Sequence, residues 1–365
     1  MGGAEKRYWE LAKHLSKKHE IYFITLKYWE NKTTYLDDTN GKIYAYGVDK
    51  AKTFYSKTGR RSLLPALNFS LKIIPYLMKE RFDIIDATYA PILHVFSLKI
   101  VKYLRKYAFV YTVHEIWSEY WKKYLGNKVI GKMAEVFEDI ALRVPDKIIT
   151  VSKTVYNQCV KKGIPPSKVK LVPNGVDINK IKNIRVSNNE KYSSDIIYVG
   201  RLVPYKGVQL LINAIKFAVK HLKTLKLLII GEGKLRGSLQ KLVEDLKIEN
   251  KIYFLGRIKN NDMLAYYYAC DIFVLPSIAK TEAFGLVQLE AMACGKPVIN
   301  TNLPTGVPYV SLDKITGVTV PPKDGKALAE AINILLNDES LRKKYGENGS
   351  CLLYTSPSPR DLSTS

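Results

Sequence analysis

Two glutamates eight positions apart could recognise the hydroxyl groups of a sugar. They are Glu282 and Glu290, in the segment formed by residues 281–298. Apolar residues in this segment recur at helical spacing, which predicts a helix that begins near Phe284 and ends at Cys294. Glu282 would then precede the helix, and Glu290 would lie about two turns along it. The alternative interpretation is that Glu282 only caps the helix and that Glu290 is solvated.

The start of this predicted helix would also be an anion site. The first N–H groups of a helix have no partner within it, and the helix dipole places positive charge there. Here those groups belong to Phe284, Gly285 and Leu286, and we expect them to face the crevice at the strand ends. Carboxylates on both sides of such a helix start suit the recognition of a nucleotide sugar.

A second candidate is a pair of cations, Arg201 and Lys206, within the segment 200–207. The segment follows a strand-like run and opens a helical period, which places both cations at the carboxyl end of a strand. A guanidinium and an ammonium on one loop can hold a diphosphate and offset the charge that develops when it leaves. A solvated loop remains the alternative. The turns at residues 231–233 and 256–257 follow two further strand-like runs.

The elements that must position these residues alternate between short apolar runs and longer amphipathic stretches. Nine runs have the length of strands and are apolar on both faces, as buried parallel strands are. They cover residues 21–24, 82–86, 109–113, 147–151, 196–199, 226–230, 252–255, 272–275 and 297–301. Helical periods, such as those at 8–15 and 208–215, lie between them. The alternation predicts an α/β protein with parallel sheets.

Two such series indicate two domains. A turn at residues 172–177 closes the first series and a polar stretch precedes the second, so we predict an N-terminal domain over 1–182 and a C-terminal domain over 183–349. Residues 350–365 lose the periodicity and are interpreted as a tail that is foreign to the fold, with a native flexible tail as the alternative.

The other end of the chain also departs from the expected pattern. A doubly wound domain normally begins with a strand that leads into a glycine-rich turn. The Gly2-Gly3 turn is present here, but no strand precedes it. We therefore expect that the first strand of the N-terminal domain is missing, and that the chain as written folds poorly or is inactive.

The composition is that of a globular protein with an unusual charge. Of 365 residues, 47% are hydrophobic and 25% are charged, which excludes wholesale disorder. The 57 Lys and Arg exceed the 34 Asp and Glu by 23, and 33 of the basic residues lie in residues 1–182 with only 17 acidic ones. This excess predicts an anionic partner such as nucleic acid, a membrane surface or a phosphorylated substrate. Scattered cysteines and the lack of a membrane-spanning run indicate a cytoplasmic protein.

Taken together, these motifs resemble the retaining glycosyltransferases of family 4, the group 1 glycosyl transferases. The resemblance covers roughly residues 2–349 and rests on the order and spacing of motifs that are each weak alone. They are Gly2-Gly3-Ala4-Glu5, His114-Glu115, Val151-Ser152, 173–177, Gly200-Arg201, Lys206-Gly207, 231–233, Pro276-Ser277 and 282–298. The resemblance implies the GT-B fold, in which two doubly wound, Rossmann-like domains face each other across an interdomain cleft.

The resemblance also implies roles for individual residues. Arg201 and Lys206 match the pair that clamps the donor diphosphate. Glu290 matches the carboxylate that receives the ribose hydroxyls, and Glu282 the one that holds hydroxyls of the transferred sugar. The other matched donor-binding positions are Gly3, Gly231, Gly233, Arg257, Ile258, Phe284, Gly285 and Leu286. His114 matches a histidine near the reacting centre, with a helix-capping or interdomain histidine as the alternative.

The implied reaction moves a hexosyl unit from a nucleotide-diphosphate sugar to a glycan or lipid-linked acceptor. The family retains the anomeric configuration by front-face attack, so Glu282 is not expected to be a double-displacement nucleophile. Asp37-Asp38 lies in a polar loop and no Asp-x-Asp motif follows a predicted strand. We therefore expect no metal and no other cofactor.

Acceptor specificity in this family lies in the N-terminal domain, which here is the basic one. The apolar and basic stretches at 63–81 and 99–106 suit contact with an anionic membrane face, so the protein would be peripheral on the inner membrane face. A solvated, lysine-rich surface is the alternative. The aromatic segment 117–124 is a candidate for acceptor contact or for packing into the core of its own domain.

Two other functions fit parts of the sequence less well. A nucleotide-sugar epimerase or another GT-B enzyme would share the fold, but an epimerase would lack the paired glutamates in this context, and no segment suggests the cofactor lysine of a phosphorylase. A basic nucleic-acid-binding protein would explain the charge. However, no helix-turn-helix, zinc-finger or RNA-binding aromatic motif accompanies that charge, so we expect no nucleic-acid partner.

Overall fold

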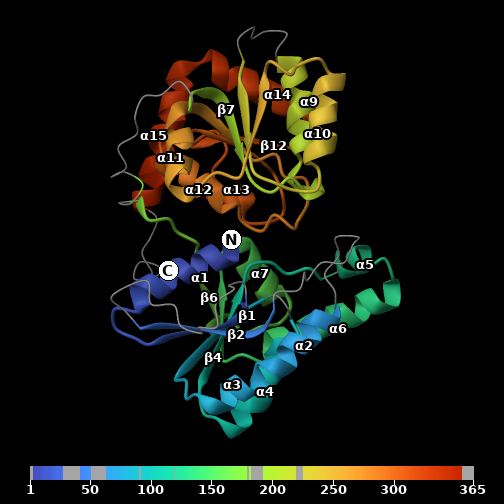
Figure 1. Ribbon diagram of the computed structural model, residues 1–365, viewed down its shortest axis with the longest axis vertical. Helices are drawn as coiled ribbons and strands as arrows, with labels where there is room; N and C mark the ends of the chain where they lie inside the picture. The colour runs from blue at the N-terminus through green and yellow to red at the C-terminus, as the bar shows by residue number, and fades with distance from the viewer. Residues whose placement is uncertain are drawn as a thin grey trace. The chain divides into compact units, whose positions relative to one another are not determined.

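The computed structural model describes residues 3–27, 42–50, 63–89, 92–118, 120–178, 181, 192–218 and 225–355 (Figure 1). The chain divides into two compact units, Met1–Pro173 and Asn174–Ser365. Each unit has its own parallel sheet and its own hydrophobic core. The boundary between the units lies nine residues before the end of the predicted N-terminal domain.

The first unit is built on a parallel sheet of four strands in the order β3-β4-β5-β6. Its strands carry fully buried side chains, including Phe109, Tyr111 and Ile148. The strands β1 and β2 form a separate parallel pair. The elements of this unit are α1 (Gly3–Leu15), β1 (Ile21–Lys27), β2 (Ile43–Lys50), α2 (Leu63–Lys72), α3 (Ile74–Lys79), β3 (Ile84–Thr88), α4 (His94–Leu104), β4 (Ala108–Val113), α5 (Tyr120–Leu125), α6 (Lys128–Arg143), β5 (Lys147–Thr150), α7 (Lys153–Lys161), η1 (Pro166–Lys168) and β6 (Val169–Leu171).

The second unit contains a parallel sheet of six strands in the order β12-β11-β10-β7-β8-β9. Its elements are β7 (Ser194–Val199), η2 (Pro204–Lys206), α9 (Val208–Ala218), β8 (Leu227–Ile230), α10 (Arg236–Asp245), β9 (Ile252–Gly256), α11 (Asn260–Ala269), β10 (Cys270–Val274), α12 (Leu286–Ala293), β11 (Val298–Thr301), α13 (Val307–Val310), β12 (Gly317–Val320), α14 (Gly325–Asn337) and α15 (Glu339–Thr355). The strand β7 comes first in the chain and lies between β8 and β10. The chain therefore reverses its direction across the sheet at β7, and such a topological switch point is where doubly wound sheets bind ligands.

Helices cover both faces of this second sheet (Figure 1). Ile196 and Tyr198 of β7 join the core formed with α9, α10 and α14. Ile197 points to the opposite face because successive side chains of a strand alternate, and α11, α12 and α15 lie on that side. All three side chains are fully buried. Burial on both faces explains why the strand is apolar at every position from 196 to 199.

The nine strand-like runs predicted from the sequence are confirmed as strands. Three further strands, β2, β6 and β12, were not predicted. Two of them have only three and four residues, and β2 interrupts its apolar residues with Gly47 and Asp49. Their parallel pairing with longer neighbours, rather than their own apolar pattern, holds them in the sheets.

Two helix boundaries also differ from expectation. The helix α12 begins at Leu286 and not near Phe284, because Gly285 serves as its N-cap with a left-handed φ of 74°. The helix α15 continues to Thr355, which carries helical structure into the segment predicted to be a foreign tail; residues 356–365 lie outside the described residues. Over the part of the chain that the structure describes, no helix is long and apolar enough to cross a bilayer.

Candidate functional site

The loops that follow β7 and β10 lie on either side of the switch point in the second unit. They contact each other directly, since the backbone N–H of Ile278 donates a hydrogen bond of 2.8 Å to the carbonyl of Tyr205. The loops carry the cations and the first glutamate that the sequence singled out. Parallel strands end at the same edge of a sheet, so residues more than seventy positions apart in the chain meet here.

Lys206 and Glu282 form a buried ion pair across these two loops. The Lys206 Nζ lies 2.5 Å from the Glu282 Oε2, and the side chains are only 11% and 10% exposed. The N-cap of α12 is Gly285 and the helix has no side-chain cap. Both simpler alternatives, a helix-capping glutamate and a lysine in a solvated loop, are therefore wrong.

The carboxylate of Glu282 is also held from the sheet. The hydroxyl of Ser277 donates a hydrogen bond of 2.9 Å to the Glu282 Oε2, and the hydroxyl of Thr301 on β11 donates one of 2.6 Å to the Ser277 carbonyl. Next to Glu282, the buried Thr281 Oγ1 has no hydrogen-bond partner among the described residues. A buried hydroxyl without a partner costs free energy, so this atom can gain from a polar ligand at the site.

Glu290 is likewise buried, but a different residue holds it. It is the fifth residue of α12, just over one turn along the helix rather than two, and it is 9% exposed. The hydroxyl of Tyr267 on α11 donates a hydrogen bond of 3.0 Å to the Glu290 Oε2. Burial, followed by the charge of Glu290, raises the pKa of Tyr267 far above its ordinary value, so this phenol remains a donor. A solvated Glu290 is therefore excluded.

Tyr205 joins the two cations. The Arg201 Nη2 donates a hydrogen bond of 2.7 Å to the Tyr205 hydroxyl. The Lys206 Nζ lies 5.8 Å from the centre of the Tyr205 ring, and the Arg201 guanidinium lies 6.0 Å from it. Arg201 is exposed whereas Lys206 is buried. The loop thus presents one accessible cation and one that is already engaged with a carboxylate.

The loops after β8 and β9 complete the same edge of the sheet. Gly231 has a φ of 140°, and a Cβ at this position would lie 1.9 Å from the carbonyl oxygen of Gly200. The β8 turn, which contains Gly231 and Gly233, therefore packs directly on the backbone of the β7 loop. The Gly231 N–H donates a hydrogen bond of 2.8 Å to the Gly256 carbonyl, and the exposed Arg257 and half-buried Ile258 follow.

Two buried amides that the sequence did not single out fix the start of α12. The Gln288 Nε2 donates to the Phe284 carbonyl at 3.1 Å, and the Asn300 Nδ2 donates to the Gln288 Oε1 at 2.9 Å. Both amide side chains are fully or almost fully buried. They hold the backbone around Phe284, Gly285 and Leu286, where the candidate anion site lies. Gln288 bonds within its own turn, but its other partners, Asn300 and the Val307 carbonyl, lie 12 and 19 positions away, so no local pattern could reveal them.

The remaining predicted site residues, Gly3 and His114, belong to the first unit. Gly3 is the exposed first residue of α1. His114 directly follows β4, and its buried Nε2 has no hydrogen-bond partner among the described residues. Burial, with a smaller contribution from the charge of Arg7, lowers the pKa of His114 to about 4. The imidazole is therefore neutral at pH 7.

Glu138, which the sequence analysis missed, organises the segment after His114. Its fully buried carboxylate accepts hydrogen bonds of 2.9 Å from the backbone N–H groups of Trp117 and Ser118, and one of 3.1 Å from the Trp121 Nε1. Tyr89 donates to it as well. A glutamate on an amphipathic helix such as α6 resembles a solvated residue in sequence, so no signal pointed to this role.

The aromatic segment 117–124 packs into the core of the first unit. Trp117 is buried, and its ring centroid lies 4.7 Å from those of Trp121 and Tyr124. Of the two roles considered for this segment, the structure supports packing. In the parts of the chain that are described, no group of three or more His, Cys, Asp or Glu residues is arranged to hold a metal ion.

Two α/β units with parallel sheets, the second of them doubly wound with cations and carboxylates at its switch point, are the architecture of the GT-B class of glycosyltransferases. Residues 1–180 match the family model described as "Glycosyltransferase Family 4", and residues 179–350 match the one described as "Glycosyl transferases group 1". The chain belongs to this family of glycosyltransferases. The fold and family predicted from the sequence are thus confirmed.

Individual relatives agree with this assignment. The chain is 31% identical over 296 residues to an uncharacterized protein in the cps region of Klebsiella pneumoniae, and the alignment covers 77% of each chain. It is 28% identical over 228 residues to O-antigen chain mannosyltransferase C of Escherichia coli, covering 61% of this chain and 59% of the relative. The chain spans little more than half the length of several curated relatives, 55% in the case of a glycosyltransferase of Methanocaldococcus jannaschii.

Solved structures show the same fold. The crystal structure of the Anabaena protein HepE in complex with UDP matches with a TM-score of 0.69 and 20% identity, covering 96% of this chain and 91% of that one.

Proposed function

We propose that this protein transfers a hexosyl unit from a nucleotide-diphosphate sugar to a glycan or lipid-linked acceptor, with retention of the anomeric configuration and without a metal. The observation that carries the proposal is the buried Lys206–Glu282 ion pair, with Arg201 beside it, at the switch point of the second sheet. This arrangement places cations for a diphosphate next to a carboxylate for sugar hydroxyls.

The two cations have complementary parts in donor binding. An ammonium group has three N–H donors, and Glu282 requires only one of them. The other two are available for a diphosphate, with Glu282 and the Tyr205 ring holding Lys206 in place. Arg201 is exposed and can swing onto the same diphosphate as a bidentate donor. Together the cations offset the charge that grows on the leaving group.

The two glutamates have different partners, and this suits different hydroxyl groups. Glu282 lies beside the buried, unpartnered hydroxyl of Thr281, so the two can bind neighbouring hydroxyls of the transferred sugar. Glu290 lies further along α12, held by Tyr267, and suits the ribose hydroxyls. The exposed Arg257 and the half-buried Ile258 follow β9 and suit the base. The backbone N–H groups at the start of α12 would contact the sugar or the phosphate.

The chemistry follows from these positions. The sugar becomes positively charged as the diphosphate leaves, and the cations stabilise the leaving group without a covalent intermediate. Because Glu282 is engaged by both Lys206 and Ser277, it is a poor nucleophile, which favours front-face attack and retention. The family resemblance assigns His114 to the sugar, and a neutral imidazole can exchange hydrogen bonds with a hydroxyl without carrying positive charge.

The relatives and the charge of the first unit indicate the classes of donor and acceptor. A hexosyl donor is supported by the relationship to an O-antigen chain mannosyltransferase, and a nucleotide-diphosphate donor by the UDP complex of HepE. The first unit carries 31 Lys and Arg against 16 Asp and Glu over residues 1–173. This excess suits an acceptor that bears phosphate, such as a lipid-linked diphosphate sugar.

Donor binding provides the first test. Thermal stability is measured with UDP, GDP and ADP sugars and with an oligonucleotide, and we expect stabilisation by one nucleotide sugar only. Lys206→Met should weaken the affinity for that donor at least tenfold, whereas Lys216→Met, at an exposed lysine on α9, should not change it. Stabilisation by the oligonucleotide alone would overturn the proposal.

Product analysis provides the second test. The donor is incubated with a lipid extract, and the new glycosidic linkage is assigned by NMR as retained or inverted. We expect retention and full activity in EDTA. Release of an isomerised nucleotide sugar without transfer would instead identify an epimerase.

A further inference from the structure

The helix α6 of the first unit exposes a continuous apolar face to solvent. Val129, Met133, Val136, Phe137 and Ile140 follow the spacing i, i+4, i+7, i+8 and i+11, which places them on one side of a helix. Val129 is 70% exposed and Met133 is 54% exposed, and the other three are also exposed. We call these five residues the α6 apolar face.

An ordinary surface helix buries its apolar stripe, but the larger apolar side chains of α6 are exposed. The buried residues of α6 are Gly131, Glu138, Ala141 and Leu142. The α6 apolar face lies outside this packing. Burial within the unit therefore does not explain why the sequence keeps apolar residues at these outer positions, and a contiguous exposed apolar patch commonly marks an interaction site.

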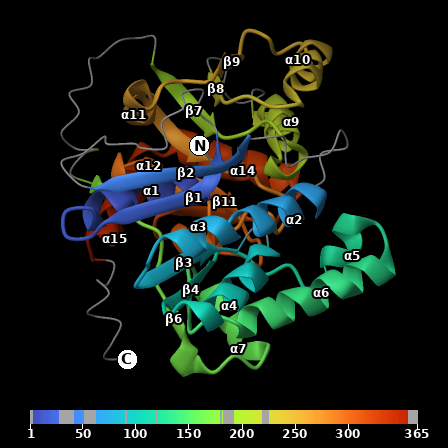
Figure 2. The same ribbon diagram turned by 60° about the horizontal axis from the view of Figure 1, so that its bottom comes forward.

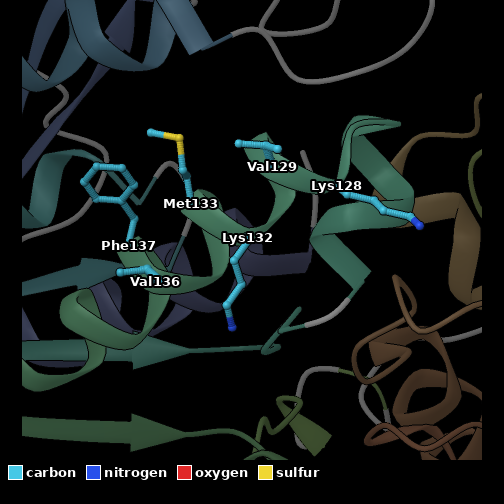
Figure 3. A pocket seen from close by; sticks show the side chains of 6 residues that line it. All are labelled: Lys128, Val129, Lys132, Met133, Val136 and Phe137. Carbon is cyan, nitrogen blue, oxygen red and sulfur yellow. The ribbon is translucent and has the colours of Figure 1, made fainter.

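The surface along this face is open and shallow. Its lining comes from α6 alone: Lys128, Val129, Lys132, Met133, Val136 and Phe137. Figure 3 shows Val129, Met133 and Phe137 projecting from the same side of the helix, while the Lys128 and Lys132 amines extend away from them. The exposed surface of these residues is almost entirely apolar, and Lys128 and Lys132 are the charged residues among them.

Two neighbouring helices also carry exposed apolar side chains. The helices α2 and α4 pack on each other, and Phe96 of α4 contacts Phe137 of α6 edge-on at 5.9 Å, so the three helices lie side by side (Figure 2). Large apolar side chains on the outer sides of α2 and α4 are exposed. They are Leu64, Leu67 and Leu71 on α2, and Ile100, Tyr103 and Leu104 on α4.

The chain around this surface is strongly basic. Residues 93–134, which include α4, α5 and the first half of α6, contain eight Lys and Arg and only two Asp and Glu. Lys132 and Lys122 share Glu135, which lies just beyond this stretch. Lys99, Lys123 and Lys128 are exposed. An apolar surface surrounded by ammonium groups is complementary to a bilayer with anionic headgroups, because apolar side chains enter the interface while lysines meet the phosphates.

We propose that the α6 apolar face, with the adjoining outer sides of α2 and α4, docks this protein on the surface of an anionic lipid bilayer. A second copy of the chain is a poorer occupant, since a two-fold contact through this surface would bring the two sets of lysines together. Docking would hold the first unit at the membrane, where a lipid-linked acceptor resides. It is measured without any donor, so its failure is distinct from failure of the transfer reaction.

Vesicle co-sedimentation of the full chain tests this inference. We expect binding to vesicles that contain 30% phosphatidylglycerol to be at least tenfold tighter than to pure phosphatidylcholine, and to weaken as salt rises from about 50 to 500 mM. The double variant Val129→Gln/Met133→Gln should bind at least tenfold more weakly. The matched control is Phe217→Gln/Ile334→Gln, which replaces two apolar residues of similar exposure, 55% and 53%, on α9 and α14.

Both double variants change exposed side chains, and unfolding curves check that they remain as stable as the parent. The proposal is overturned if the two variants bind vesicles equally, or if the parent binds neutral and anionic vesicles equally. Sedimentation velocity addresses the second-copy alternative. Membrane docking would be refuted if the parent is a dimer that does not bind vesicles and the Val129→Gln/Met133→Gln variant is a monomer. That result would assign the face to self-association.

Discussion

Removing either partner of the Lys206–Glu282 ion pair should lower the free energy of unfolding of the second unit. Removing both partners should lower it by less than the sum of the two single effects. The perturbations are Lys206→Met, Glu282→Gln and the double variant. Each single change leaves a charged group in a site where the side chains are only 11% and 10% exposed. The double change leaves two neutral side chains of similar volume in the same space.

The size of the effect follows from the geometry. At the observed separation of 2.5 Å and an effective dielectric constant near 20, the attraction between the charges is about 7 kcal/mol, and desolvation of the two ions offsets most of it. Lys206→Met should cost about 3 kcal/mol, because Ser277 is then the only side chain among the described residues that donates to Glu282. Glu282→Gln should cost about 2 kcal/mol, because the amide oxygen can still accept that bond. We expect the double variant to cost about 2 kcal/mol, so the coupling energy is about 3 kcal/mol.

The assay must separate the two units. All four tryptophans, at positions 9, 29, 117 and 121, lie in residues 1–173, so their fluorescence reports unfolding of the first unit. Urea unfolding followed by hydrogen exchange at β7 and β10 reports the second. The variants should shift the exchange transition and leave the fluorescence transition in place. Strictly additive costs in the double variant would refute the ion pair as the stabilising interaction.

Three further predictions concern single residues. Burial lowers the pKa of His114 from 6.5 to about 4, so the folded state keeps this imidazole neutral where the unfolded state would protonate it. The free energy of unfolding is therefore highest above pH 6.5 and falls as the pH falls toward 4. At pH 5 we expect a loss of about 2 kcal/mol in fluorescence-monitored unfolding, and no such loss in His114→Asn. Glu138→Gln turns an amide N–H₂ toward hydrogen-bond donors and should lower the free energy of unfolding of the first unit by about 3 kcal/mol. The control Asp139→Asn, at a more exposed side chain, should lower it by less than about 1 kcal/mol. Gly285→Ala should cost about 2 kcal/mol by circular dichroism unfolding, because its φ is 74° and the added Cβ would lie 2.6 Å from the Leu275 Cδ2; an unchanged midpoint would contradict the left-handed N-cap.

The strands and the residues at their ends could be predicted from the sequence because those signals are local. A buried parallel strand is apolar at every position, and the turn that follows it carries glycine or charged residues. Arg201, Lys206 and Glu282 were therefore placed on the correct loops. Glu290 was placed on the correct helix, but its depth along that helix was overestimated because a left-handed Gly285 delays the start of α12.

The pairing of these residues could not be predicted in the same way. Nothing in the local sequence indicates that Lys206 lies against Glu282, that Tyr267 holds Glu290, or that Glu138 is buried beneath Trp117. Each contact joins elements that are distant in the chain. The exposure of the α6 apolar face could not be predicted either. An apolar stripe in a sequence ordinarily indicates burial, and only the packing shows that this one is exposed.

The sequence by itself thus determined the α/β class, the run of strands and helices, the family, and the side chains available for diphosphate and hydroxyl groups. Only the tertiary structure decided which of those side chains are partners and which surfaces are left uncovered. The physical reason is the strand order. The strand β10 pairs with β7 rather than with β9, which precedes it in the chain, so the loops that carry Glu282 and Lys206 become neighbours through the sheet.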